Sequence, residues 1–200
     1  MAKTVYIASV ARTPVGSMGA ALASFTAPQL GTKAIHAAIG RAGIKPAEVD
    51  EVFFGNVLTA NTGQAPARQA ALGAGISNTV PCTTVNKVCA SGSKSTIFGI
   101  QSILLGDADL VVAGGMESMS NTPFYMDKAR FGYKLGNGSI IDGILKDGLW
   151  DVYNDFHMGN AAELCAEECS ISREEQDEYA VNSYKRAAEA TANGYFSDEI

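Results

Sequence analysis

The sequence is poor in charge, and basic residues are especially scarce. Only 18% of its 200 residues are charged, against about one quarter in ordinary soluble domains. Its 15 Lys and Arg against 21 Asp and Glu give a net charge of −6, and no basic cluster reverses that sign locally. We therefore expect no nucleic-acid partner, because the chain would repel a phosphate backbone. The shortage of charge also predicts a largely covered surface, through stacked layers or a partner subunit.

Long apolar runs are missing as well. No stretch approaches the ~20 residues needed to cross a bilayer, so we expect no membrane partner. The opening "MAKTVYIASVAR" has one lysine and a short apolar stretch, and its β-branched residues favour a strand over a signal peptide. No Arg- and Ser-rich leader is present, which predicts a cytoplasmic protein. A processed mitochondrial form is the alternative.

Motifs for disulfides, zinc and nucleotides are also absent. The chain has four cysteines, with no CxxC pair: Cys82, Cys89, Cys165 and Cys169. We expect them to be reduced thiols. Two cysteines lie one helical turn apart, but with only two histidines in the chain we expect no zinc site. No GxGxxG follows the first expected strand, which argues against a nucleotide-binding domain.

What the sequence does contain is a regular alternation of strand and helix patterns over residues 1–117. We expect strands at Thr4–Ala11, 51–57, 80–87 and 108–115, and helices at Ala27–Gly43, 65–75 and 89–106. Such alternation requires crossover connections, so it predicts an α/β fold with a parallel or mixed sheet and helices on its faces.

The regular pattern stops near Glu117. Residues 118–156 are rich in Gly, aromatics, Met and Asn without clean periodicity, and long irregular segments are commonly functional. Helices are expected again at 159–169 and 172–194, the second starting with a capping box of Ser172 and Glu175. The pattern thus divides the chain into an α/β domain at 1–117 and a loop domain, incomplete, at 118–200.

The stretch "NKVCASGSKS" makes Cys89 the main candidate for chemistry. The helix expected after it carries Lys94 as its one charge, which predicts that the helix is enclosed on most sides. If that helix begins at Cys89, unpaired N–H groups and the helix dipole favour thiolate over thiol, and the same N–H groups could hold an oxyanion. The alternative is a free cysteine that serves as a small buried apolar residue.

A cysteine nucleophile normally needs a base, and the chain offers two imidazoles. His36 lies within an expected surface helix. His157 falls where the irregular segment meets a helix and is the better site candidate, either for ligand contact or for proton transfer.

Several motifs together resemble the thiolases, and most closely the acetoacetyl-CoA type. They are "ARTPVG" at 11–16, "GNV…GQAPARQA" at 55–70, "VCASG" around Cys89, "VVAGGMESMS" at 111–120 and "HMG" at 157–159. The resemblance runs from Val5 to Ile200. It implies the layered αβαβα thiolase fold with a mixed sheet, of which this chain is the N-terminal half plus part of the loop domain.

The resemblance implies acetyl-CoA C-acetyltransferase activity. Cys89 would take an acetyl group as an enzyme thioester, and a second acetyl-CoA would attack it to form acetoacetyl-CoA; thiolysis is the reverse. The resemblance places His157 and Met158 in the acyl pocket. It matches Tyr184 to a tyrosine that binds potassium beside CoA in some members, with ordinary helix packing as the alternative. Coenzyme A thioesters are then substrates, potassium is a possible cofactor, and no tightly bound cofactor is expected.

One departure from the family pattern limits this reading. The second half of a thiolase supplies two histidine-bearing elements and a second cysteine, and none of these motifs occurs here. We therefore expect a protein about twice as long, assembled as a homodimer or homotetramer, and little turnover by this chain alone. The alternatives are a degradative 3-ketoacyl-CoA thiolase of broader chain length and, if the chain ends at Ile200, a non-catalytic acyl-CoA-binding or assembly module.

Overall fold

The computed structural model describes residues 3–200, and the chain forms two compact units, Met1–Gly148 and Leu149–Ile200. The main sheet of the first unit is parallel throughout, with strand order β2-β1-β3. Its strands are β1 (Glu51–Gly55), β2 (Cys82–Val85) and β3 (Val111–Gly115). The strands that we expected in these three regions are confirmed, although the main sheet has no antiparallel member among the described residues.

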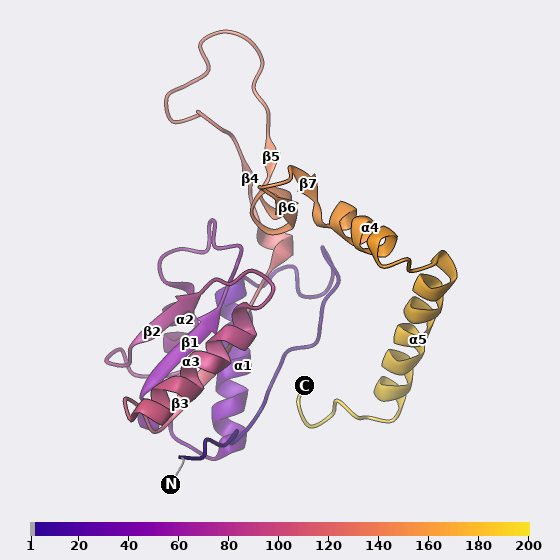
Figure 1. Cartoon of the computed structure of the whole chain (residues 1–200). Coiled ribbons are helices and arrows are strands. Elements are labelled where there is room, and N and C mark those ends of the chain that lie inside the picture. The colour runs from indigo at the N-terminus through magenta and orange to yellow at the C-terminus, as the bar shows by residue number, and fades with distance from the viewer. Residues whose placement is uncertain (1–2) are drawn as a thin grey trace. The chain divides into compact units, whose positions relative to one another are not determined.

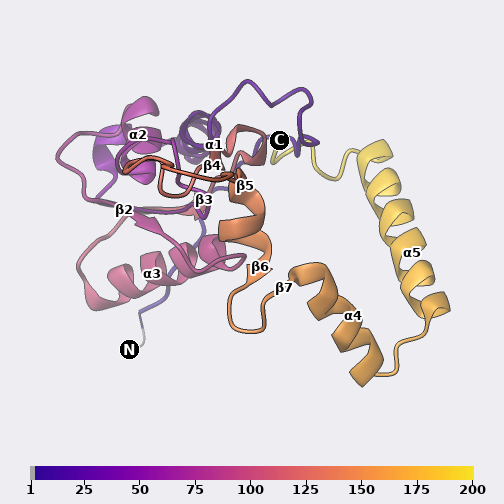
Figure 2. The same ribbon diagram turned by 90° about the horizontal axis from the view of Figure 1, so that it is seen from above.

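Helices cover both faces of this sheet. They are α1 (Ala27–Ala42), α2 (Pro66–Gly73) and α3 (Ser91–Leu105). Side chains alternate between the faces of a strand, so Phe54 packs against α1 while the neighbouring Phe53 meets Phe98 of α3, with ring centroids 5.6 Å apart. Figure 2 shows α1 and α2 on one side of the strands and α3 on the other. The result is a three-layer α/β unit.

The apolar core lies on the side of α1 and α2. Its buried residues are Ala27, Ile35, Ile39, Val49, Val52, Phe54, Ala67, Ala70, Ala71, Ala74, Ile76, Val80 and Met116. Helix α1 is held at both ends: Thr26 and Gln29 form a capping box, which sequence reasoning missed, and Gly43 ends the helix at φ 67°, a conformation that glycine adopts without steric cost.

The expected strand at Thr4–Ala11 does not form. This segment runs beside α1 instead (Figure 1), where the Ser9 hydroxyl donates to Ala38 O at 2.6 Å and Arg41 donates to Val10 O at 3.1 Å. The strand order β2-β1-β3 leaves a free outer edge on both β2 and β3, but the hydrogen bonds described for Ser9 and Val10 go to α1 and not to either edge. The β-branched composition of this segment predicted a strand, but composition alone does not determine whether a segment pairs with a sheet.

Helix α3 turns its small residues to the sheet and its large ones away from it. Ser91, Ser95, Gly99 and Ser102 are buried, whereas Ile97, Ile100 and Leu104 are exposed and Leu105 is 78% exposed. The expectation that this helix is enclosed on most sides is therefore wrong for the described chain, because only the sheet covers it. The small inner residues bring the helix axis close to the strands.

The rest of the chain consists of short elements and two helices. Short helical turns lie at Pro46–Glu48, Met119–Asn121 and Leu145–Leu149, and short strands form the pairs β4 (Phe124–Tyr125) with β5 (Ile141–Asp142) and β6 (Trp150–Asp151) with β7 (Phe156–His157). Helices α4 (Met158–Glu168) and α5 (Arg173–Ala192) follow, and the predicted capping box of Ser172 and Glu175 is present.

The first unit continues past residue 117. Ser118 and Asn121 hydrogen-bond to Phe25 O at 2.8 and 2.9 Å, which ties the segment after β3 to the chain before α1. The division into domains at 1–117 and 118–200 stays a prediction. Across residues 3–200, no helix is both long enough and apolar enough to span a bilayer.

Candidate functional site

Cys89 lies on a tight turn between β2 and α3. Gly55 pairs with Val85 and with Gly115, so all three parallel strands end at one edge of the sheet, the edge where ligands of open α/β sheets commonly bind. The Cys89 thiol is exposed there. Helix α3 begins at Ser91 rather than at Cys89, and its first full helical bond runs from Lys94 N to Ala90 O at 2.8 Å. Cys89 therefore lies two residues before the first residue of the helix, with Ala90 as the N-cap between them.

The residue before this cysteine is strained. Val88 has φ +48°, a region that β-branched residues very rarely occupy and that costs on the order of 1–3 kcal/mol. Its side chain is 52% exposed, so packing does not hold it. Hydrogen bonds do: Asn86 Oδ1 accepts from the Val88 amide at 3.0 Å, and Val88 O accepts from the Ser91 hydroxyl at 2.6 Å. Sequence reasoning missed this strain, because φ at residue 88 depends on those bonds.

Small residues let the turn sit directly on the sheet edge. A Cβ on Gly55 would stand 2.8 Å from Ser91 Cβ, and one on Gly115 would stand 3.5 Å from Gly92 Cα. A side chain at Gly55 would push the start of α3 away from the strands, whereas a Cβ at Gly115 would only reach ordinary van der Waals contact with it. The small residues noted around Cys89 thus have a defined role, which is close approach of backbone to backbone.

A half-buried carboxylate joins the loops that follow β1 and β3. Glu117 accepts hydrogen bonds from the amides of Val57 and Leu58, at 2.9 and 3.1 Å. The Asn56 amide group also donates to it, at 2.6 Å, from a side chain that is only 1% exposed. Burial raises the pKa of Glu117, and these donors offset part of that rise. The residues that donate these hydrogen bonds directly follow Gly55 in the chain, so the bonds to Glu117 hold the end of β1 against which the Cys89 turn packs.

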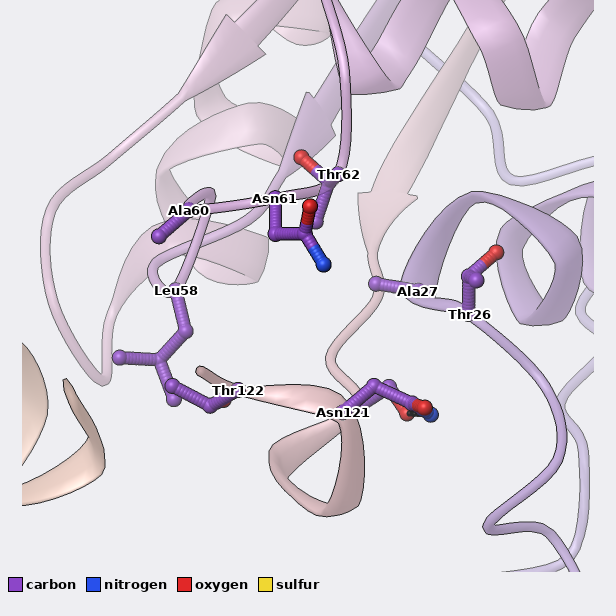
Figure 3. Close-up of a pocket in the computed structure, with 9 residues that line it drawn as sticks. Thr26, Ala27, Leu58, Ala60, Asn61, Thr62, Asn121 and Thr122 are labelled. Carbon is purple, nitrogen blue, oxygen red and sulfur yellow. Dashed lines mark hydrogen bonds between the residues drawn. The ribbon is translucent and has the colours of Figure 1, made fainter. Parts of the chain in front are cut away.

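A small cavity of about 90 Å³ opens beside these loops (Figure 3). Leu58, Asn61 and Thr122 are among the residues that line it, and Thr122 Oγ1 is buried without a hydrogen-bond partner. The volume admits a few water molecules. None of the predicted site residues lines it, and it holds no acid, base or thiol.

His157 and Met158 lie together in the second unit, where they start α4. His157 is the N-cap of that helix, and its Nδ1 accepts from the Gly159 amide at 2.8 Å. A neutral imidazole with Nδ1 occupied in this way carries its proton on Nε2, which is then a donor. His36, by contrast, is an exposed residue of α1, as expected for a surface role.

Tyr184 also lies in the second unit, on α5. It is 81% exposed, and its phenol supplies one oxygen, whereas hard cations take several. Within residues 3–200, no group of three or more His, Cys, Asp or Glu side chains is placed so that it could hold a metal ion. Cys89 belongs to the first unit, and the other three predicted residues belong to the second.

Comparison with known proteins decides the family. Residues 5–200 match the model of the thiolase N-terminal domain. The chain belongs to the thiolase family. The crystal structure of the Acat5 thiolase from Ascaris suum in complex with coenzyme A superposes on this thiolase chain with a TM-score of 0.95 and 39% identity, covering 99% of this chain and 51% of that one. The expected thiolase fold is confirmed.

Curated relatives are closer in sequence. The chain is 61% identical to acetyl-CoA acetyltransferase 2 of Arabidopsis thaliana, over 99% of this chain and 49% of that protein. It is 59% identical to an acetyl-CoA acetyltransferase of Gibberella zeae described as cytosolic, over 98% of this chain and 50% of that protein. The thiolase chain thus spans about half the length of the curated relatives it matches.

Proposed function

We propose that this thiolase chain supplies the nucleophile of an acetyl-CoA acetyltransferase, and that the nucleophile is Cys89. One observation carries the proposal: an exposed, free cysteine lies two residues before the start of α3, in a chain 61% identical to an acetyl-CoA acetyltransferase. The resemblance between the motifs and the family's nucleophile region agrees with this placement.

The first half-reaction is an acyl transfer. The Cys89 thiolate attacks the carbonyl carbon of acetyl-CoA, a new C–S bond forms, and the bond to the coenzyme A sulfur breaks. Coenzyme A leaves as a thiolate and takes up a proton. Amides at the start of α3 are suited to stabilise the oxyanion of the tetrahedral intermediate. In the second half-reaction the methyl carbon of another acetyl-CoA loses a proton and attacks the thioester, which gives acetoacetyl-CoA and the free thiol.

His157 and Met158 supply substrate contacts in this proposal. The Nε2–H of His157 is a donor for a thioester or pantetheine oxygen, because Nδ1 is already engaged at the helix start. Met158 adds an apolar, adaptable wall for the acyl group. Tyr184 remains the candidate for potassium, and no step of the reaction is routed through that ion.

Deprotonation of the second acetyl-CoA requires groups that residues 1–200 do not provide. We assign that role to the portion of the relatives' length that this chain does not span, in the histidine and cysteine motifs that the family implies. The open apolar side of α3 is consistent with a further layer above it, as in an αβαβα assembly, and with a dimer or tetramer. The name of the Gibberella zeae relative supports a cytoplasmic location.

The test is acylation followed by peptide mapping. The protein is incubated with acetyl-CoA and its intact mass is measured; we expect the addition of one acetyl group, located on Cys89. Cys89→Ala should abolish the addition, whereas Cys165→Ala, which removes another exposed thiol, should leave it unchanged. Binding of coenzyme A without acetylation would support the assembly-module alternative instead.

Chain-length preference separates the proposal from a degradative thiolase. The curated relatives named above favour two-carbon units, since both are described as acetyl-CoA acetyltransferases. We expect faster thiolysis of acetoacetyl-CoA than of a long-chain 3-ketoacyl-CoA. Equal or faster cleavage of the long chain would reverse the assignment.

A further inference from the structure

The turn that carries Cys89 is held by one buried hydroxyl. Ser91 is 5% exposed, and its Oγ donates to Val88 O at 2.6 Å while it accepts from the Lys87 amide at 2.9 Å. The Ser91 amide donates to the same Val88 carbonyl at 3.0 Å. The hydroxyl thus accepts from the Asn86–Lys87 peptide group and donates its single proton to the Val88–Cys89 peptide group.

These bonds hold Val88 at a positive φ that it would not keep without them. Valine at φ +48° relaxes toward negative φ unless something opposes the change. Such a relaxation rotates the Val88–Cys89 peptide and carries the thiol away from the start of α3. Ser91 cannot follow, because its Cβ and carbonyl carbon are pressed against Gly55 at the sheet edge.

We propose that Ser91 is a positioning residue for acyl transfer: its hydroxyl, together with the Asn86 side chain, holds Val88 in the left-handed conformation and so keeps Cys89 in its place before the start of α3. This inference rests on the proposed function, in which Cys89 is the nucleophile. It concerns a residue that touches the turn rather than the substrate.

A matched control lies one helical turn away. Ser95 is fully buried on the same face of α3, and its hydroxyl donates to Ser91 O at 2.9 Å within the helix. Ser95→Ala therefore removes a buried hydroxyl from the same layer that bonds to the Ser91 carbonyl, while the bonds of the Ser91 hydroxyl to Lys87 and Val88 remain. In the full chain we expect Ser91→Ala to slow acetylation of Cys89 by about 10- to 100-fold, the range for a small misplacement of a reacting group, and Ser95→Ala to change it by less than about twofold.

Rescue by glycine distinguishes positioning from a general loss of structure. We call the hydrogen bonds of the Ser91 hydroxyl and of the Asn86 side chain around Val88 the clamp. Glycine adopts positive φ without steric cost, so a chain that carries Val88→Gly depends less on the clamp. Ser91→Ala should then cost clearly less in that background than in the parent. Equal losses in both backgrounds, or equal rates for the Ser91 and Ser95 variants, would overturn the proposal.

Two further measurements separate this proposal from the proposed function. Asn86→Ala removes an acceptor on an exposed side chain, so it tests the same clamp if Ser91→Ala does not fold. We expect it to slow acetylation of Cys89 less than Ser91→Ala does, and we expect Asn86→Asp to restore the rate. An unchanged rate in Asn86→Ala would count against the clamp. Alkylation of Cys89 by iodoacetamide, read by peptide mass, needs no acetyl-CoA. If the parent is not acetylated, the proposed function fails, and slower alkylation in Ser91→Ala still supports the clamp, while an unchanged rate refutes it.

Discussion

Gly55 at the end of β1 and Ser91 at the start of α3 touch backbone to backbone. A Cβ added to Gly55 would stand 2.8 Å from Ser91 Cβ and 2.9 Å from the Ser91 carbonyl carbon. Real Cβ atoms do not approach so closely, and neither partner is the flexible end of a side chain. The contact joins the central strand to the turn that carries Cys89.

This contact predicts the effect of Gly55→Ala. The added methyl must displace the start of α3, so we expect a loss of about 1–3 kcal/mol in the free energy of unfolding and slower acetylation of Cys89. Gly40→Ala is the control: a Cβ there meets nothing within 4 Å on helix α1, and alanine should stabilise the helix by roughly 0.5–1 kcal/mol. Denaturant unfolding measures both, and equal stabilities would contradict the described packing.

Glu117 predicts a pH dependence of stability. Its pKa is raised above 4.5, chiefly by burial, so its contribution to stability is fully present below pH 4.5 and is lost as the pH rises through the folded-state pKa. Glu117→Gln does not titrate. The parent should therefore lose stability relative to the Gln variant as the pH rises across this window. Unfolding free energies measured at a series of pH values test this, and a constant difference would refute it.

Asp50 predicts the opposite dependence. Its carboxylate accepts from the amides of Leu110 and Asp109, both at 2.9 Å, and these bonds lower its pKa below 3.8. The stabilisation is present above pH 3.8 and is lost as the pH falls through the folded-state pKa. Asp50→Ala should cost about 1 kcal/mol near neutral pH, and less in acid. A cost that does not shrink in acid would rule out the charge-assisted bonds.

Tyr125 should titrate late. Its hydroxyl donates to Asp147 Oδ2 at 2.5 Å, and this bond, aided by burial and by the nearby charge, raises the pKa of Tyr125 to about 12. Among the seven tyrosines, the difference in tyrosinate absorbance between the parent and Tyr125→Phe isolates this group. Asp147→Asn removes the charge, so the pKa should fall toward its ordinary value of 10; no change would exclude the pairing.

The sequence predicts local structure well where local chemistry decides it. The C-terminal end of α1 follows from Gly43, and the strand that begins at Glu51 follows from its apolar run. The Thr4–Ala11 strand failed because a strand forms only by pairing with a neighbour, and this segment bonds to α1 rather than to the free edge of β2 or β3. A propensity scale holds no information about that neighbour.

The site was predictable only in part. Position left Cys89 open as a nucleophile or a small buried residue, and the motif resemblance selected it as the nucleophile, which stays a prediction. The positive φ of Val88 was not predictable, because it depends on the hydrogen bond from the Ser91 hydroxyl and on the close approach of Ser91 to Gly55. The hydrogen bonds to Glu117 were missed for a similar reason, because their donors lie about sixty residues earlier in the chain.

Acetylation of Cys89 tests the central claim most directly. The protein is mixed with acetyl-CoA, quenched in acid to preserve thioesters, and digested for mass analysis of each cysteine-bearing peptide. We predict one acetyl group, on the peptide that contains Cys89, and its loss when free coenzyme A is then added in excess, because the transfer is reversible. An acetyl group on Cys82, Cys165 or Cys169 instead, or none while coenzyme A still binds, would contradict the assignment of Cys89 as the acyl acceptor.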